Sequence, residues 1–157
     1  MGLPVDSLDL QSSSFNGDKD ALEKFLRNAA HLYRISFTSS AVLKPRTIDA
    51  LIDKYLPVDG GSFIVKNDRS LVSQEQLEKL VLKCEMSNKK VNITVNTIFG
   101  LNVEEFFDFD KYYSKKRAED GVICAVRDGA RLEVRVKLVT HIYLVWEWVE
   151  LDLCGTT

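Results

Sequence analysis

The residues of this chain that could move protons in a reaction are few. His141 is one of only two histidines, and Tyr33 and Tyr55 are phenols that could edge a cavity. A histidine held within hydrogen-bond reach of an aspartate, such as Asp49 or Asp53, could act as a general acid or base. Nothing in the spacing indicates that these residues meet, and a hydrogen-bonded polar histidine at a strand end is the simpler interpretation. We keep Tyr33, Tyr55 and His141 as candidate pocket residues and predict no catalytic residue.

Cysteine and histidine usage argues against a metal centre. Cys84, Cys124 and Cys154 are widely spaced and form no CxxC pair, whereas a small secreted disulfide scaffold is usually denser and even in number. We expect three reduced thiols, mostly buried as small apolar side chains. Neither His31 nor His141 lies at a helical spacing from a cysteine, so we expect no metal site. The chain also has no glycine-rich phosphate loop, GxSxG or HExxH motif, and we expect no cofactor.

Composition is that of an ordinary globular domain. The chain has 157 residues, of which 45% are hydrophobic and 28% charged, with a net charge of −2. This length predicts one domain. No apolar run approaches the ~18 residues of a membrane span, and the N-terminus lacks the basic and apolar regions of a signal peptide. We therefore expect a cytoplasmic or nuclear protein that does not bind membranes.

A balanced charge gives no general attraction to phosphate backbones. The three adjacent basic residues Lys115, Lys116 and Arg117 could meet phosphates, but Glu119 and Asp120 follow at once. A solvated turn is the better interpretation of this run, and we do not expect nucleic acid as a partner.

The segment from Asn102 to Asp120 has the most unusual composition in the chain. Acidic residues alternate with aromatic ones before the basic run, as in Glu104, Glu105, Phe106, Phe107, Asp108, Phe109, Asp110, Tyr112 and Tyr113. Partly exposed aromatic side chains are favoured anchors at protein interfaces, which indicates a partner-binding or dimer-edge segment. The alternative is an extended strand pair with Phe107, Phe109 and Tyr113 in the core and the charges in water.

The stretch from Arg131 to Leu153 is predicted to form the central strands. Apolar and charged residues alternate from Arg131 to Leu138, which is typical of a strand with one wet face. From Tyr143 onwards both parities are apolar, so this strand needs cover on two sides. One side carries Leu144, Trp146 and Trp148, and the other carries Tyr143, Val145, Val149 and Leu151 around Glu147. The run is too long for one strand, so we expect a turn within residues 139–144.

Helices are predicted mainly upstream. We predict a flexible tail over residues 1–17, followed by a long helix whose apolar stripe runs from Leu22 to Phe37. A short helix follows Thr47, and Ser73 and Gln76 form a capping box that opens a third helix. Strands are predicted at residues 62–66, 91–97 and 122–126, and Asp128-Gly129 indicates a hairpin turn.

This order of elements resembles the nuclear transport factor 2-like superfamily. Phe63 to Leu77 is similar to that family's strand, turn and capped third helix, and Arg131 to Leu153 is similar to its closing hairpin. The resemblance implies one α+β domain over residues 18–154. In it, a strongly curved antiparallel sheet wraps around a long N-terminal helix, with two further short helices. It also implies a cavity that sometimes holds a ligand and a sheet face that commonly forms a dimer. The long connection over 101–120 departs from the family pattern.

We therefore expect a non-catalytic interaction domain that pairs through its β-sheet with itself or a related chain. The alternative is a small-molecule-binding or isomerase/lyase-type domain with its site inside the cone, so a small-molecule ligand remains open. The candidate interface residues are Phe107, Phe109, Tyr112, Tyr143, Val145, Trp146, Trp148 and Val149.

Overall fold

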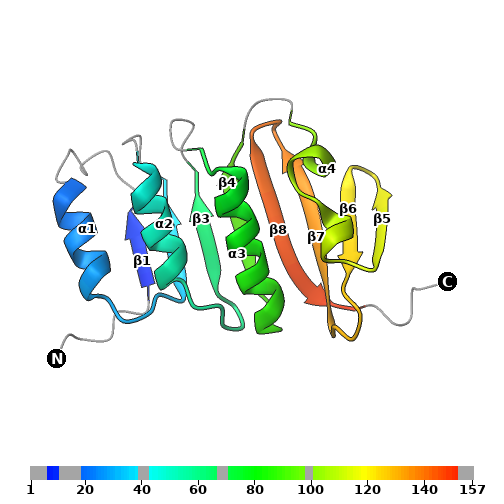
Figure 1. The fold of residues 1–157 in the computed structure, drawn as a ribbon, viewed down its shortest axis with the longest axis horizontal. Helices are drawn as coiled ribbons and strands as arrows, with labels where there is room; N and C mark the ends of the chain where they lie inside the picture. The colour runs from blue at the N-terminus through cyan, green and yellow to red at the C-terminus, as the bar shows by residue number, and fades with distance from the viewer. Residues whose placement is uncertain (1–6, 11–18, 39–42, 67–70, 98–100, 152–157) are drawn as a thin grey trace.

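The computed structural model describes residues 7–10, 19–38, 43–66, 71–97 and 101–151 (Figure 1). They form an α+β fold built on one eight-stranded sheet with the order β1-β2-β3-β4-β8-β7-β6-β5. The strands are β1 (Ser7–Leu10), β2 (Arg34–Phe37), β3 (Ser62–Val65), β4 (Asn92–Asn96), β5 (Lys115–Glu119), β6 (Val122–Val126), β7 (Leu132–Val139) and β8 (Tyr143–Glu150). The helices are α1 (Lys19–Asn28), α2 (Pro45–Lys54), α3 (Gln74–Ser87), α4 (Val103–Phe106) and the 3-10 helix η1 (Phe109–Lys111).

The first half of the sheet is a row of strand–helix units. Strands β1 to β4 are parallel neighbours in chain order, and a helix connects each strand to the next. Ser7, Arg34, Ser62 and Asn92 lie side by side, so successive units are 27, 28 and 30 residues long. This regularity is typical of a short strand–helix solenoid, in which each unit packs only on its neighbours.

The solenoid character is also visible in the buried side chains of the units. Buried residues of one unit recur 29 residues later in the next, which places them at equivalent positions against the sheet. These pairs are Leu43 and Val72, Ile48 and Leu77, Leu51 and Leu80, Ile52 and Val81, and Tyr55 and Cys84. The repeated positions share only an apolar character and not a residue type.

The second half of the sheet is antiparallel. Strands β5, β6, β7 and β8 follow one another by hairpins, and β8 pairs with β4 to join the two halves. The predicted turn within residues 139–144 is confirmed, with positive φ at Thr140 and His141. The Asp128-Gly129 turn between β6 and β7 is also confirmed, with Gly129 at φ 77°. The capping box of α3 is present, with both Ser73–Gln76 hydrogen bonds formed.

The long first helix and the curved antiparallel sheet were wrong predictions. Helix α1 ends at Asn28, and Arg34–Phe37 form strand β2 instead of a further helical turn. Ile35 and Phe37 are buried while Arg34 is exposed, so this segment has a period of two and takes its hydrogen bonds from the sheet. The sheet is mixed and is not strongly curved (Figure 1). Ser7–Leu10, predicted within the tail, form strand β1.

All of the described helices lie on one face of the sheet (Figure 1). Helices α1, α2 and α3 cover the parallel half, and the 103–111 segment covers part of the antiparallel half. Phe107 meets Trp146 edge to face at 5.0 Å between ring centroids, and Phe109 stacks on the same indole at 5.7 Å. None of the described helices is long and apolar enough to cross a membrane.

A buried carboxylate connects α3 to the antiparallel half. The Glu85 side chain is only 2% exposed. Its Oε1 accepts a hydrogen bond of 3.0 Å from Trp148 Nε1, and its Oε2 accepts one of 3.3 Å from Arg127 Nε. Burial, together with the charge of Glu85, raises the pKa of the neighbouring Tyr113 hydroxyl. A carboxylate can be accommodated inside a protein when donors of this kind surround it.

We predict that Glu85→Ala lowers the free energy of unfolding by about 3 kcal/mol or more. The change leaves the Trp148 indole N–H without an acceptor and Arg127 without its counter-charge. Urea unfolding followed by circular dichroism measures the loss. Glu78→Ala is the control, because Glu78 lies on the same helix but its side chain is 39% exposed and accepts hydrogen bonds from Lys111 and Tyr112. Equal losses for the two variants would contradict the structural role of Glu85.

Candidate functional site

The face of the sheet opposite the helices is the candidate functional site, and we call it the helix-free face. No described helix lies on this face (Figure 1). Side chains alternate between the two faces along each strand, and those on the helix-free face point away from the core. On β8, for example, Leu144, Trp146 and Trp148 are buried under the helical layer, whereas Val145 and Val149 of the opposite parity are half-buried. The helix-free face is therefore the large surface of the sheet that the described part of the chain leaves uncovered.

Strand register places residues of four strands, three of them charged, in one row across this face. Arg117 of β5 lies beside Cys124 of β6, which lies beside Arg135 of β7, and Arg135 lies beside Glu147 of β8. A second row consists of Glu119, Val122, Lys137 and Val145. The rows continue onto the parallel half through Asn92 and Thr94 of β4.

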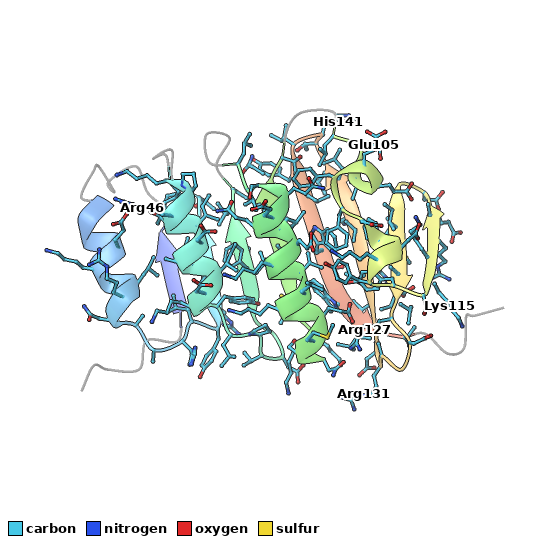
Figure 2. All side chains as sticks on the ribbon, in the orientation of Figure 1. Arg46, Glu105, Lys115, Arg127, Arg131 and His141 are labelled. Atoms are coloured by element: carbon cyan, nitrogen blue, oxygen red, sulfur yellow. The ribbon has the colours of Figure 1, made fainter. Side chains whose placement is uncertain are left out.

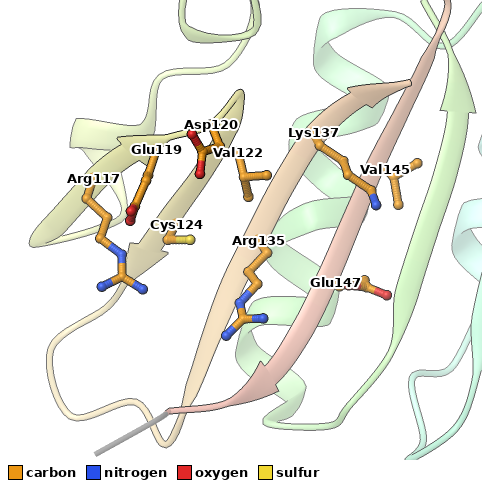
Figure 3. Close-up of a pocket in the computed structure, with 9 residues that line it drawn as sticks. All are labelled: Arg117, Glu119, Asp120, Val122, Cys124, Arg135, Lys137, Val145 and Glu147. Carbon is orange, nitrogen blue, oxygen red and sulfur yellow. The ribbon is translucent and has the colours of Figure 1, made fainter. Parts of the chain in front are cut away.

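A depression of about 340 Å³ lies over the antiparallel half of this face (Figure 3). The short side chains of β6 lie between the longer side chains of β5 and β7, which creates the hollow (Figure 3). Three basic and three acidic residues line it together with three less polar ones, namely Arg117, Arg135, Lys137, Glu119, Asp120, Glu147, Val122, Cys124 and Val145. The lining thus carries both signs of charge in equal number.

Glu133 fixes the two arginines at the edge of this depression. Its side chain is 7% exposed, and it pairs with Arg117 Nη2 at 3.3 Å and with Arg135 Nε at 3.4 Å. The hydrogen bond to Cys124 and the charge of Glu133 raise the pKa of Arg117. Both guanidinium groups are therefore held beside one carboxylate and keep further N–H donors for another acceptor.

Two charges at the centre of the face have no such partner. Within the described part of the chain, neither Lys137 nor Glu147 forms a hydrogen bond or an ion pair. Both are exposed, and Val145 lies between them as a half-buried apolar residue. The Tyr143 ring at the end of the same strand lies under the Lys66 ammonium, which is 5.5 Å from the ring centroid. The site therefore has the chemistry of a recognition surface, with apolar, aromatic and charged groups intermixed.

The structure divides the candidate interface residues into three groups. Phe107, Phe109, Trp146 and Trp148 are at most 3% exposed and lie in the core, where a partner does not reach them. Tyr112 is half-buried and donates a hydrogen bond to Glu78, whose pKa this contact and Lys111 lower. Only Tyr143, Val145 and Val149 lie on the helix-free face.

The candidate pocket residues are not brought together. Tyr55 is 1% exposed and packs edge to face on Phe63 at 5.5 Å, and burial raises the pKa of its hydroxyl. Tyr33 is half-buried just before β2, whereas His141 lies exposed in the β7–β8 turn (Figure 2). Cys84 and Cys124 are free thiols, and Cys154 lies outside the described residues. Among the described residues, no group of three or more His, Cys, Asp or Glu could hold a metal ion.

Arg117, Glu133, Arg135 and Lys137 were not among the predicted site residues. The sequence carries a signal for Glu133, Arg135 and Lys137, because the alternation from Arg131 to Leu138 predicts a strand with its charged side chains on a wet face. A solvent-exposed strand face can be recognised as part of a site only when the neighbouring strands of the sheet are known. Arg117 in particular reaches this row through the pairing of β5 with β6.

We predict that Glu133→Gln lowers the free energy of unfolding by about 1–2 kcal/mol, because it leaves two guanidinium groups beside a neutral amide. The loss should shrink as salt is added, since salt screens the repulsion between Arg117 and Arg135. Urea unfolding at low and high ionic strength measures both effects. Glu119→Gln on the exposed strand β5 should show neither, and a salt-independent loss at Glu133 would refute the electrostatic explanation.

Comparison of the chain with protein-family models, with curated proteins and with solved structures gives no match.

Proposed function

We propose that this chain is a non-catalytic protein-interaction domain that pairs with itself or a related chain through the helix-free face of its sheet. The observation that carries the proposal is that all described helices lie on one face of an eight-stranded sheet. Apolar and charged side chains are intermixed on the opposite face, around Val145 and Arg135.

The parallel half of the sheet supports this proposal. Parallel sheets normally have both faces covered, whereas β1 to β4 have described helices on one side only. Strand–helix solenoids commonly use an extended surface of this kind to bind other proteins. A protein partner on the helix-free face would provide the cover that a parallel sheet usually has.

Pairing through the face is favoured over pairing through the β5 edge of the sheet. The five residues of β5 are all exposed, and Lys115, Lys116 and Arg117 place consecutive positive charges on that edge strand. Charged edge strands, especially those with lysine, are a common means of preventing edge-to-edge association. The basic run of this segment thus acts against strand addition at β5.

The relationship to the nuclear transport factor 2-like superfamily stays a proposal as well. The α+β class and the closing hairpin of β7 and β8 support it. The parallel arrangement of β1 to β4 was not part of that expectation. The proposed function therefore rests on the residues of this chain and does not depend on the relationship.

Small-molecule binding is the second candidate, and the depression over β6 is the observation that favours it. Its volume of about 340 Å³ falls at the lower end of the range for ligand pockets. Its lining is charged and contains none of Tyr33, Tyr55 or His141, so a ligand there would be polar and no acid–base chemistry is indicated. A protein partner uses the whole face and accounts for more of its residues.

We predict that Val145→Glu weakens self-association of the chain at least tenfold and leaves its fold intact. Val145 is half-buried on the helix-free face, so a carboxylate there adds charge without entering the core. Sedimentation velocity over a dilution series measures association, and circular dichroism checks folding. Met86→Glu is the control, because Met86 is a 57% exposed apolar residue on helix α3 in the other layer. A wild-type chain that stays monomeric at high micromolar concentration would contradict the proposal for self-pairing.

A further inference from the structure

We infer that the partner on the helix-free face is a second copy of this chain, related by a two-fold axis that runs parallel to the strands between β7 and β8. This inference rests on the proposed function and adds to it the identity and the register of the partner. It gives a role to Arg135, Lys137 and Glu147, the exposed charged residues at the centre of the helix-free face.

The first argument is the arrangement of opposite charges at the centre of the face. Arg135 and Glu147 are exposed register partners on adjacent strands. Arg135 directs its Nε to Glu133, which leaves both of its Nη groups available. Glu147 has no hydrogen-bond or ion-pair partner in the described part of the chain. Each copy thus presents one donor and one acceptor at the same level along the strands.

A two-fold axis between these strands converts this pattern into self-complementarity. The axis lies between the two facing sheets and runs parallel to the strands. Rotation about it keeps the position of each residue along the strand direction but reverses the order of the strands. Strand β7 of one copy therefore faces β8 of the other. Arg135 of one copy then faces Glu147 of the other, and symmetry forms the pair twice. Face-to-face sheets pack about 10 Å apart, a gap that an arginine and a glutamate side chain bridge together.

The neighbouring positions fit the same arrangement. In the second row, Lys137 faces Val145 of the partner, and the alkyl stem of a lysine can cover an apolar side chain while its ammonium stays in water. The next strands outward on either side are β4 and β6, and β4 of one copy faces β6 of the other. Thr94 and Asn92 then lie above Val122 and Cys124, the short side chains within the depression.

Charge balance argues for a second copy over a partner of one sign. The depression is lined by three basic and three acidic residues. A nucleic acid or a strongly acidic peptide would meet as many repulsive as attractive charges there. A second copy brings both signs in the reciprocal order, so each central charge meets its opposite.

Complementary charge reversal tests the inference. Arg135→Glu and Glu147→Arg each place like charges opposite one another in their own dimers, and each should weaken self-association about tenfold or more. An equimolar mixture of the two variants restores both contacts. In one contact, the carboxylate introduced at position 135 faces the guanidinium introduced at position 147, and in the other the two native side chains, Glu147 and Arg135, face each other. We expect the mixture to form a heterodimer with nearly the wild-type dissociation constant in sedimentation velocity experiments.

A second series guards against misfolding of Arg135→Glu, which adds a carboxylate beside buried Glu133. Glu147→Arg lies on the open surface, and its dimer with the wild-type chain has one matched and one repulsive contact. Its dissociation constant should fall between those of the two homodimers. If Val145→Glu abolishes pairing but Glu147→Arg pairs as tightly as the wild type, the face is correct and the two-fold arrangement is overturned. A wild-type chain that does not pair at all overturns the proposed self-pairing itself.

Discussion

The fold depends most on the carboxylate of Glu85. It lies where helix α3, the β6–β7 connection and strand β8 meet, and it binds one donor from the connection and one from the strand. An apolar residue at this position would leave the Trp148 indole N–H unpaired in the core. The aromatic layer above β8 is built against this pair, because Trp148 stacks on Trp146 at 6.3 Å and Trp146 contacts Phe107 and Phe109. One carboxylate thus orders the aromatic residues of two distant segments.

This arrangement explains why the helices gather on one side. In the parallel half, each strand is followed by a helix that returns over the same face, as right-handed crossovers require when strands are added in one direction. In the antiparallel half, the indoles of β8 point to that same face and draw the 103–111 segment over them. Both halves therefore bury the same side of the sheet, and the charged side chains of β7 and β8 lie on the other side. The helix-free face follows from how the core is filled.

Local signals in the sequence predicted local structure well. Ser73 and Gln76 formed the expected capping box. Two of the three hairpins among β5 to β8 lie where Asp128-Gly129 and the length of the run from Arg131 to Leu153 indicated. The side chains of β8 were also divided correctly into two faces, because alternation identifies which side chains share a face. Alternation did not identify the buried face, so Trp146 and Trp148 were predicted at the interface although both lie in the core. Alternation does not identify the neighbouring strand. The row that joins Arg117 to Glu147 depends on contacts between distant segments, and no periodicity contains it. The parallel pairing of β1 to β4 is accompanied by a 29-residue recurrence of buried positions, but these positions share only an apolar character. Leu32 to Phe37 illustrates the ambiguity, since its apolar residues fit a helical stripe and a short strand equally well.

The last described strand occupies the middle of the sheet. Strand β8 lies between β4 and β7, and Asn92 pairs with Glu147 across a gap of 55 residues. During synthesis, the β4 edge of the solenoid half therefore stays unpaired until β8 has been synthesised. The β7 edge of the β5–β7 strands stays unpaired for the same time. Pairing between segments so far apart is slow because the intervening chain must first be ordered. The central seam of the sheet is thus its latest part to close, and nascent chains would need protection from aggregation at this seam.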